Sequence, residues 1–201
     1  MRNTPIRAGL GALLLLLLLF CLGDSESVAA LLLPVAAHEL GHLLALWILG
    51  LPIRSFRVEL RGLCIEYGGH TGALGHAFAA AAGPLAGFCY ALVLSRLGVR
   101  CDSDWMCLSA GISLALTLFN LLPALPLDGG VLLLHVSRAV LGVKLSRKLT
   151  EASGLLVGAG LLGWGFSVLL HGGGLAPVLA AIWLLLSQES GQGLVKRRDL
   201  V

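Results

Sequence analysis

The stretch that decides the fold is Ser27-VAALLLPVAAHELGHLLALWILGLP-Ile53, an apolar run that one acidic residue, Glu39, interrupts. An α-helix rises about 1.5 Å per residue, so about 20 residues cross a hydrocarbon layer about 30 Å thick. The run is therefore long enough to form a helix that spans a membrane.

The composition extends this interpretation to the whole chain. Of the 201 residues, 57% are hydrophobic and 12% are charged, whereas about 25% of a typical soluble domain is charged. The mean hydropathy of +0.92 excludes intrinsic disorder, which requires low hydrophobicity and high net charge. The formal net charge of +3 gives no reason to expect a nucleic-acid partner. Cys101 and Cys107 could form a disulfide on an oxidising side of the membrane or remain free.

Uncharged runs separated by charged clusters predict six membrane helices. Their approximate bounds are residues 8–23, 28–50, 75–95, 105–122, 152–170 and 174–190. The first could instead be a signal peptide, but no A-x-A-like cleavage site follows it, which favours an uncleaved span. No polar stretch is long enough for a separate soluble domain, so we expect residues 1–201 to form a single polytopic membrane domain.

Lysine and arginine residues predict the orientation of these helices. They cluster before the first span and after the second, fourth and sixth, which all lie on one side: Arg2 and Arg7; Arg54, Arg57 and Arg61; Arg138, Lys144, Arg147 and Lys148; Lys196, Arg197 and Arg198. Because basic residues favour the cytoplasmic side, both termini are predicted to be cytoplasmic. Residues 54–67 alternate polar and apolar side chains, which indicates a small cytoplasmic β-hairpin. The predicted fold class is an all-α membrane protein with this hairpin after the second span.

The second predicted span contains His38-ELG-His42, the HExxH pattern of zinc proteases. Residues four apart share a helix face, so His38 and His42 can hold one metal while Glu39 stands beside its open position. A carboxylate inside an apolar helix costs about 2.5 to 3.5 kcal/mol and usually indicates function. The alternative is that the two imidazoles hydrogen-bond to backbone within the bundle.

Catalytic zinc usually takes three protein ligands, and the candidate third ligand is Asp128. It lies in Asn120-LLPALPLDG-Gly130, where two prolines interrupt the helix and two glycines permit unusual backbone angles. The alternative for Asp128 is the N-cap of a following helix, Val131 to Val140, and on this segment alone that is the simpler interpretation. Asn120 could donate to an oxyanion or form an interhelical hydrogen bond.

A third pattern, Ala82-GPLA-Gly87, indicates close helix packing, because Gly83 and Gly87 form a GxxxG face. Together the three motifs resemble the signatures of the site-2 protease family of intramembrane zinc metalloproteases. The layout is most similar to the bacterial branch that includes the stage IV sporulation protease. The resemblance implies that His38, His42 and Asp128 bind one Zn²⁺ and that Glu39 is the catalytic carboxylate. It also implies a bacterial cell membrane, a membrane-protein substrate and a regulatory membrane protein as a further partner.

The sequence therefore predicts an intramembrane zinc metalloendopeptidase that cleaves a membrane-embedded or membrane-adjacent peptide. Such a substrate must unwind, and the hairpin edge offers main-chain pairing for the unwound strand. The alternative is a non-proteolytic zinc-binding transporter or scaffold. Transporters often contain internal repeats, which this sequence lacks. The presence of Glu39 also favours a catalytic function over a transport or scaffold function.

Overall fold

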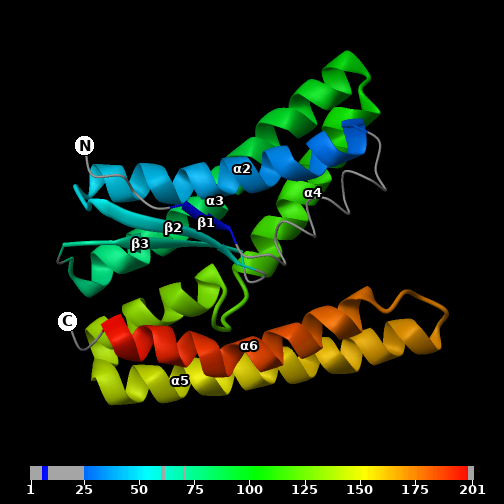
Figure 1. The fold of residues 1–201 in the computed structure, drawn as a ribbon. Helices are drawn as coiled ribbons and strands as arrows, with labels where there is room; N and C mark the ends of the chain where they lie inside the picture. The colour runs from blue at the N-terminus through cyan, green and yellow to red at the C-terminus, as the bar shows by residue number, and fades with distance from the viewer. Residues whose placement is uncertain (1–5, 9–24, 60–61, 70, 199–201) are drawn as a thin grey trace. The chain divides into compact units, whose positions relative to one another are not determined.

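The computed structural model describes residues 6–8, 25–59, 62–69 and 71–198, and it divides the chain into two units, Met1–Phe119 and Asn120–Val201. Figure 1 shows the elements of both units. In chain order they are β1 (Ile6–Ala8), α2 (Ser25–Ile48), β2 (Ile53–Glu59), β3 (Gly62–Tyr67), α3 (Ala73–Cys101), α4 (Asp104–Asn120), α5 (Asp128–Leu170) and α6 (Ala176–Arg198).

Three helices, α2, α3 and α4, form the helical part of the first unit, and small polar side chains of α4 link them. Ser109 donates from its Oγ to the carbonyl oxygen of Ala30 on α2, at 3.1 Å. One turn further along, Ser113 Oγ donates to the carbonyl oxygen of Gly87 on α3, at 2.8 Å. Residues four apart share a helix face, so the α4 face that carries these serines lies against both neighbours. Small residues on this face let the backbones approach closely.

The first unit also contains a three-stranded sheet in the order β1-β2-β3. Strands β2 and β3 occupy the segment for which the sequence predicts a hairpin, and they pair antiparallel. Strand β1, which the sequence analysis did not predict, pairs parallel with β2 and aligns Ile6 with Phe56. Strand β2 is therefore central, and a substrate strand cannot add along it where β1 is paired. Ala8, the first residue of the predicted span 8–23, is in β1, and residues 9–23 lie outside the described residues.

The second unit is built from α5 and α6. The sequence predicts separate helices over residues 131–140 and 152–170, but the structure joins them into the 43-residue α5 with a kink at Gly142. Gly142 has φ 76°, which glycine adopts without steric cost, so one residue redirects the helix without a loop. Helix α5 ends at Leu170 and α6 begins at Ala176, with the predicted break at residues 171–174 between them.

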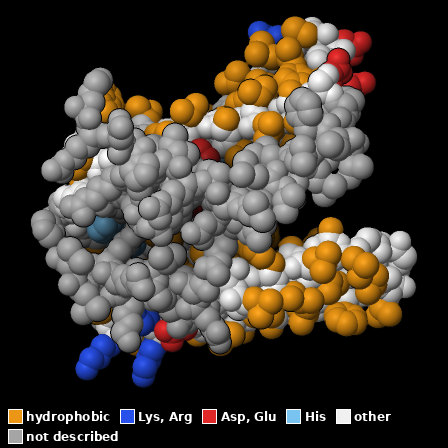
Figure 2. All heavy atoms as spheres, viewed as in Figure 1, with side chains coloured by type: hydrophobic (Ala, Val, Ile, Leu, Met, Phe, Trp, Pro, Cys, Tyr) orange, Lys and Arg blue, Asp and Glu red, His pale blue; other side chains and the backbone are white. Residues whose placement is uncertain are grey.

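Three of the described helices, α2, α3 and α5, are long and apolar enough to cross a membrane. The prediction of six spans is therefore not supported by helix length and composition: α4 has 17 residues, and the apolar part of α6 is Ala176–Gln188. Large apolar side chains are nevertheless exposed throughout, for example Trp47 (77%), Leu156 (74%) and Leu186 (72%). Figure 2 shows such side chains over the visible part of α5 and α6. Exposed apolar surface on this scale fits an integral membrane protein.

Candidate functional site

Helix α2 brings the two predicted metal-binding histidines together. Their Nε2 atoms lie 3.2 Å apart and their ring centroids 4.9 Å apart. Two ligands at the usual Zn–N distance of about 2.0–2.1 Å, separated by a tetrahedral angle, would have nitrogens about 3.3 Å apart. The observed separation thus fits two imidazoles on one tetrahedral metal ion. His38 is buried, with 4% of its surface exposed, and His42 is half-buried.

The orientation of the His42 ring is set by helix α3. Its Nδ1 atom lies 2.8 Å from the carbonyl oxygen of Ala79. A carbonyl only accepts hydrogen bonds, so Nδ1 carries the hydrogen of the neutral ring and Nε2 keeps its lone pair. This tautomer is the one that binds a metal through Nε2, and such a backbone contact is the usual second partner of a metal-binding histidine.

Glycines explain how α2 and α3 approach closely enough to make this contact. A Cβ atom added at Gly41 would clash with the carbonyl oxygen of Ala82 and lie 2.6 Å from the Cβ atom of Ala86. A Cβ atom at Gly83 would clash with the His42 imidazole. The packing role expected for Gly83 is present, and the structure adds a second role that the sequence analysis missed: Gly83 makes room for a candidate metal ligand. The sequence did contain a signal for this role. Gly83 and Gly87 repeat a small residue every four positions, on a helix that packs against the one that carries the histidines.

Glu39 follows His38 on the same helix and is half-buried. The helix around Glu39 and the two histidines is mostly apolar, so a carboxyl group at this position carries the desolvation cost expected inside an apolar helix.

The segment between α4 and α5 is irregular, as its prolines predict. Helix α4 ends at Asn120, which is half-buried, and the next seven residues form turns in which Leu127 N donates to the carbonyl oxygen of Ala124 at 2.9 Å. A Cβ atom at Gly129 would clash with the backbone of Leu121, and one at Gly130 would clash with the backbone of Ala124. The two glycines thus let the start of α5 lie directly on the turn.

Asp128 is the first residue of α5, and the N-cap is Leu127, in an extended conformation with no side-chain cap hydrogen bond. The alternative in which Asp128 is the N-cap of a helix from Val131 to Val140 is therefore wrong, because α5 begins earlier. Asp128 is half-buried, and a carboxylate in the first turn interacts favourably with the helix dipole.

Comparisons with known proteins agree with the motifs. Residues 103–163, which include α4, the irregular segment and much of α5, match the family described as Peptidase family M50. Over 147 residues the chain is 34% identical to sll0528 of Synechocystis sp., a protein assigned as a zinc metalloprotease. Over these segments the chain is similar to proteins of peptidase family M50. The alignment covers 69% of this chain and 37% of the relative, so the chain spans little more than a third of that protein's length.

A solved structure has a similar fold. The chain is similar to the Site-2 Protease from Methanocaldococcus jannaschii with a TM-score of 0.70, over 95% of this chain and 92% of that chain. The sequence identity is 21%, so this likeness is evidence for the fold. The resemblance to site-2 proteases that the three motifs indicate is confirmed.

Proposed function

We propose that this chain is an intramembrane zinc metalloendopeptidase that cleaves a membrane-embedded or membrane-adjacent peptide. The observation that carries the proposal is the pair of imidazole Nε2 atoms 3.2 Å apart on an apolar helix, with Glu39 next to one of them. The family and the assignment of the Synechocystis relative support the same activity.

His38, His42 and Asp128 are the residues that would hold the ion. Two imidazole nitrogens and one carboxylate oxygen are a donor set typical of catalytic zinc, with one position left for water or substrate. Zinc bound there would polarise the scissile carbonyl and lower the pKa of water at the open position.

The remaining chemistry falls to side chains of this chain. Glu39 accepts a proton from the attacking water and later donates a proton to the leaving amine. Asn120 donates from its amide to the oxygen of the scissile carbonyl as negative charge develops there. Replacing Asn120 by Ala should then slow cleavage without loss of zinc.

Substrate capture by strand addition has to use an outer strand of the sheet. Because β2 is central, the outer partner of the predicted hairpin is β3. We therefore assign the main-chain pairing of an unwound substrate to β3, with a membrane protein as the substrate and a second membrane protein as the regulator.

The sheet also constrains the topology. Strand β1 pairs with β2, so residues 6–8 and the segment after α2 lie on the same side of any membrane that α2 crosses. We assign this side of the membrane to the cytoplasm of a bacterial cell.

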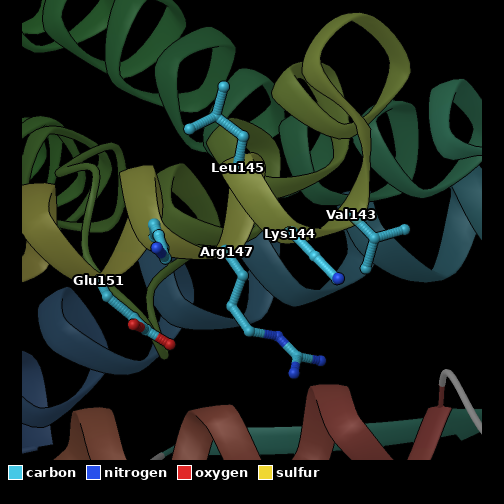
Figure 3. A pocket seen from close by; sticks show the side chains of 6 residues that line it. Val143, Lys144, Leu145, Arg147 and Glu151 are labelled. Carbon is cyan, nitrogen blue, oxygen red and sulfur yellow. The ribbon is translucent and has the colours of Figure 1, made fainter.

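The basic side chains of α5 support the same orientation. Lys144, Arg147 and Lys148 line a hollow of about 430 Å³ together with Val143, Leu145 and Glu151. Figure 3 shows Lys144 and Arg147 pointing to one side of α5, opposite to Leu145. Such a basic face favours the cytoplasmic surface. Reporter fusions after Tyr67 and Ser146 should report cytoplasm, and fusions at Asp102 and Gly173 should report the exterior. A cytoplasmic signal at Asp102 would contradict this orientation.

The activity is tested by co-expression with candidate single-span membrane proteins. The native chain should release a shorter product from a true substrate, and a Glu39→Gln chain at equal abundance should leave that substrate intact. If both chains bound zinc and neither cleaved any candidate, a non-proteolytic zinc-binding transporter or scaffold would be the better description.

A further inference from the structure

The irregular segment before α5 is tied to a distant part of the same helix. Ser153 donates from its Oγ to the carbonyl oxygen of Pro123 at 2.7 Å, across 30 residues of the sequence. The same Oγ also lies 3.0 Å from the carbonyl oxygen of Thr150, one turn back in α5. The bond to Thr150 is the ordinary local contact of a helical serine, whereas the bond to Pro123 joins the helix to the turn that precedes Asp128.

The kink at Gly142 makes this contact possible. A straight helix rises about 1.5 Å per residue, so Ser153 would lie about 37 Å along the axis from Asp128, where α5 begins. The positive φ of Gly142 instead turns the second half of α5 back toward the start of the first half. Ser153 can therefore reach Pro123, which precedes Asp128 in the irregular segment.

The carbonyl group of Pro123 needs a partner from outside the turn. In a continuous helix it would accept from the N–H of Leu127, four residues further along. That N–H donates instead to the carbonyl oxygen of Ala124, at 2.9 Å. The turn is buried, with exposed fractions of 0% for Ala124 and 5% for Leu127, and a buried carbonyl without a hydrogen bond is costly. The Ser153 hydroxyl supplies the bond that the helix cannot.

We propose that Ser153 is a positioning residue for the metal ligand Asp128. The inference rests on the proposed zinc site. The Ser153 bond fixes Pro123 near the start of the turn, and the close packing of Gly129 and Gly130 fixes its end. Asp128 lies between these two anchors, so the backbone that carries its carboxylate is fixed before zinc binds. A ligand that is already in place binds more tightly than one that must first be ordered.

The test is zinc retention by the purified full-length protein in competition with a chelator, compared among the native chain, Ser153→Ala and Ser146→Ala. Ser146 is the matched control, because it is buried in the same half of α5 and donates locally to the carbonyl oxygen of Val143 at 3.0 Å. Loss of an outer partner of a metal site typically costs about 10- to 100-fold in metal affinity. We expect a loss of about 10-fold for Ser153→Ala and near-native retention for Ser146→Ala. A cooperative unfolding transition of the metal-free protein shows that each variant is folded.

A second measurement separates positioning from a general loss of stability. If Ser153 acts through Asp128, Ser153→Ala should weaken zinc binding in the native background but not in an Asp128→Ala background, whose lower affinity is measured at higher zinc concentrations. Changes that act through one group are not additive. A general loosening of the fold would instead lower the affinity by the same factor in both backgrounds.

The outcomes separate this inference from the proposed function. Three results would each overturn the positioning role and leave the zinc site itself in place: native zinc retention in Ser153→Ala, a loss equal to that in Ser146→Ala, or the same further loss in the Asp128→Ala background. A native chain that bound no zinc would instead overturn the proposed function on which the inference rests.

Discussion

The two regions that carry the candidate metal ligands are built in different ways. His38 and His42 are one turn apart on the regular helix α2, and the helical repeat alone places both imidazoles on one side. Asp128 follows seven irregular residues and owes its position to close backbone contacts at Gly129 and Gly130. The positions of the two histidines can therefore be inferred from their spacing in the sequence. The position of Asp128 depends on backbone contacts that no spacing in the sequence indicates.

The largest expected effect that separates the two regions comes from Gly83→Ala. The added Cβ would clash with the His42 imidazole, which is a side chain and can swing away. We therefore expect Gly83→Ala to lose zinc and detectable cleavage, while the protein still folds with nearly native thermal stability. The matched control is Gly111→Ala on α4, where an added Cβ meets nothing within 4 Å. If Gly83→Ala bound zinc as well as the control, the account of the α2 region would be wrong.

A smaller effect, on thermal stability rather than on zinc content, is expected from Gly130→Ala. Here the added Cβ would meet the backbone of Ala124 and Leu125, which cannot rotate away. Overpacking of this kind typically costs about 1–3 kcal/mol of folding free energy. The melting temperature should therefore fall even in the metal-free protein. Gly160→Ala on α5, with open space around it, is the control and should be neutral or slightly stabilising. An unchanged melting temperature in Gly130→Ala would show that the turn is not held by this contact.

The smallest expected effect concerns β3, which lies outside both regions. Of two neighbouring residues in an outer strand, one directs its N–H to the paired strand and the other directs it outward. Proline placed in turn at Leu63 and Cys64 removes one N–H each time. One variant should cut cleavage without changing zinc content, and the other should weaken the sheet itself. Unchanged cleavage in both, at normal protein levels, would exclude strand addition at β3.

The same contrast explains how much the sequence could predict. Helices at the predicted spans 28–50, 75–95 and 152–170 and the histidine pair were predictable, because apolar runs and a four-residue spacing translate directly into helices and faces. The parallel strand β1 was not, because three residues carry no pattern and their partner lies about fifty residues away in the sequence. The continuity of α5 through its basic cluster was also missed. Charged residues indicate where a membrane span stops but not whether the helix stops with it.

The site was predictable to a similar degree. The close approach of the two histidines followed from one motif. The start of α5 did not, because the N-cap position depends on the extended Leu127 rather than on the capping preference of Asp128. The role of Gly83 needed the structure, since its neighbour, His42, is on another helix.

The central claim is that Asp128, from the irregular region, completes the site that the regular region begins, while Glu39 handles protons without holding the ion. Zinc content per chain, measured on purified native, Glu39→Gln and Asp128→Ala proteins alongside cleavage, tests it most directly. We expect about one zinc in the native chain, native zinc without cleavage in Glu39→Gln, and loss of both zinc and cleavage in Asp128→Ala. Full zinc and full cleavage in Asp128→Ala would contradict the assignment of the third ligand.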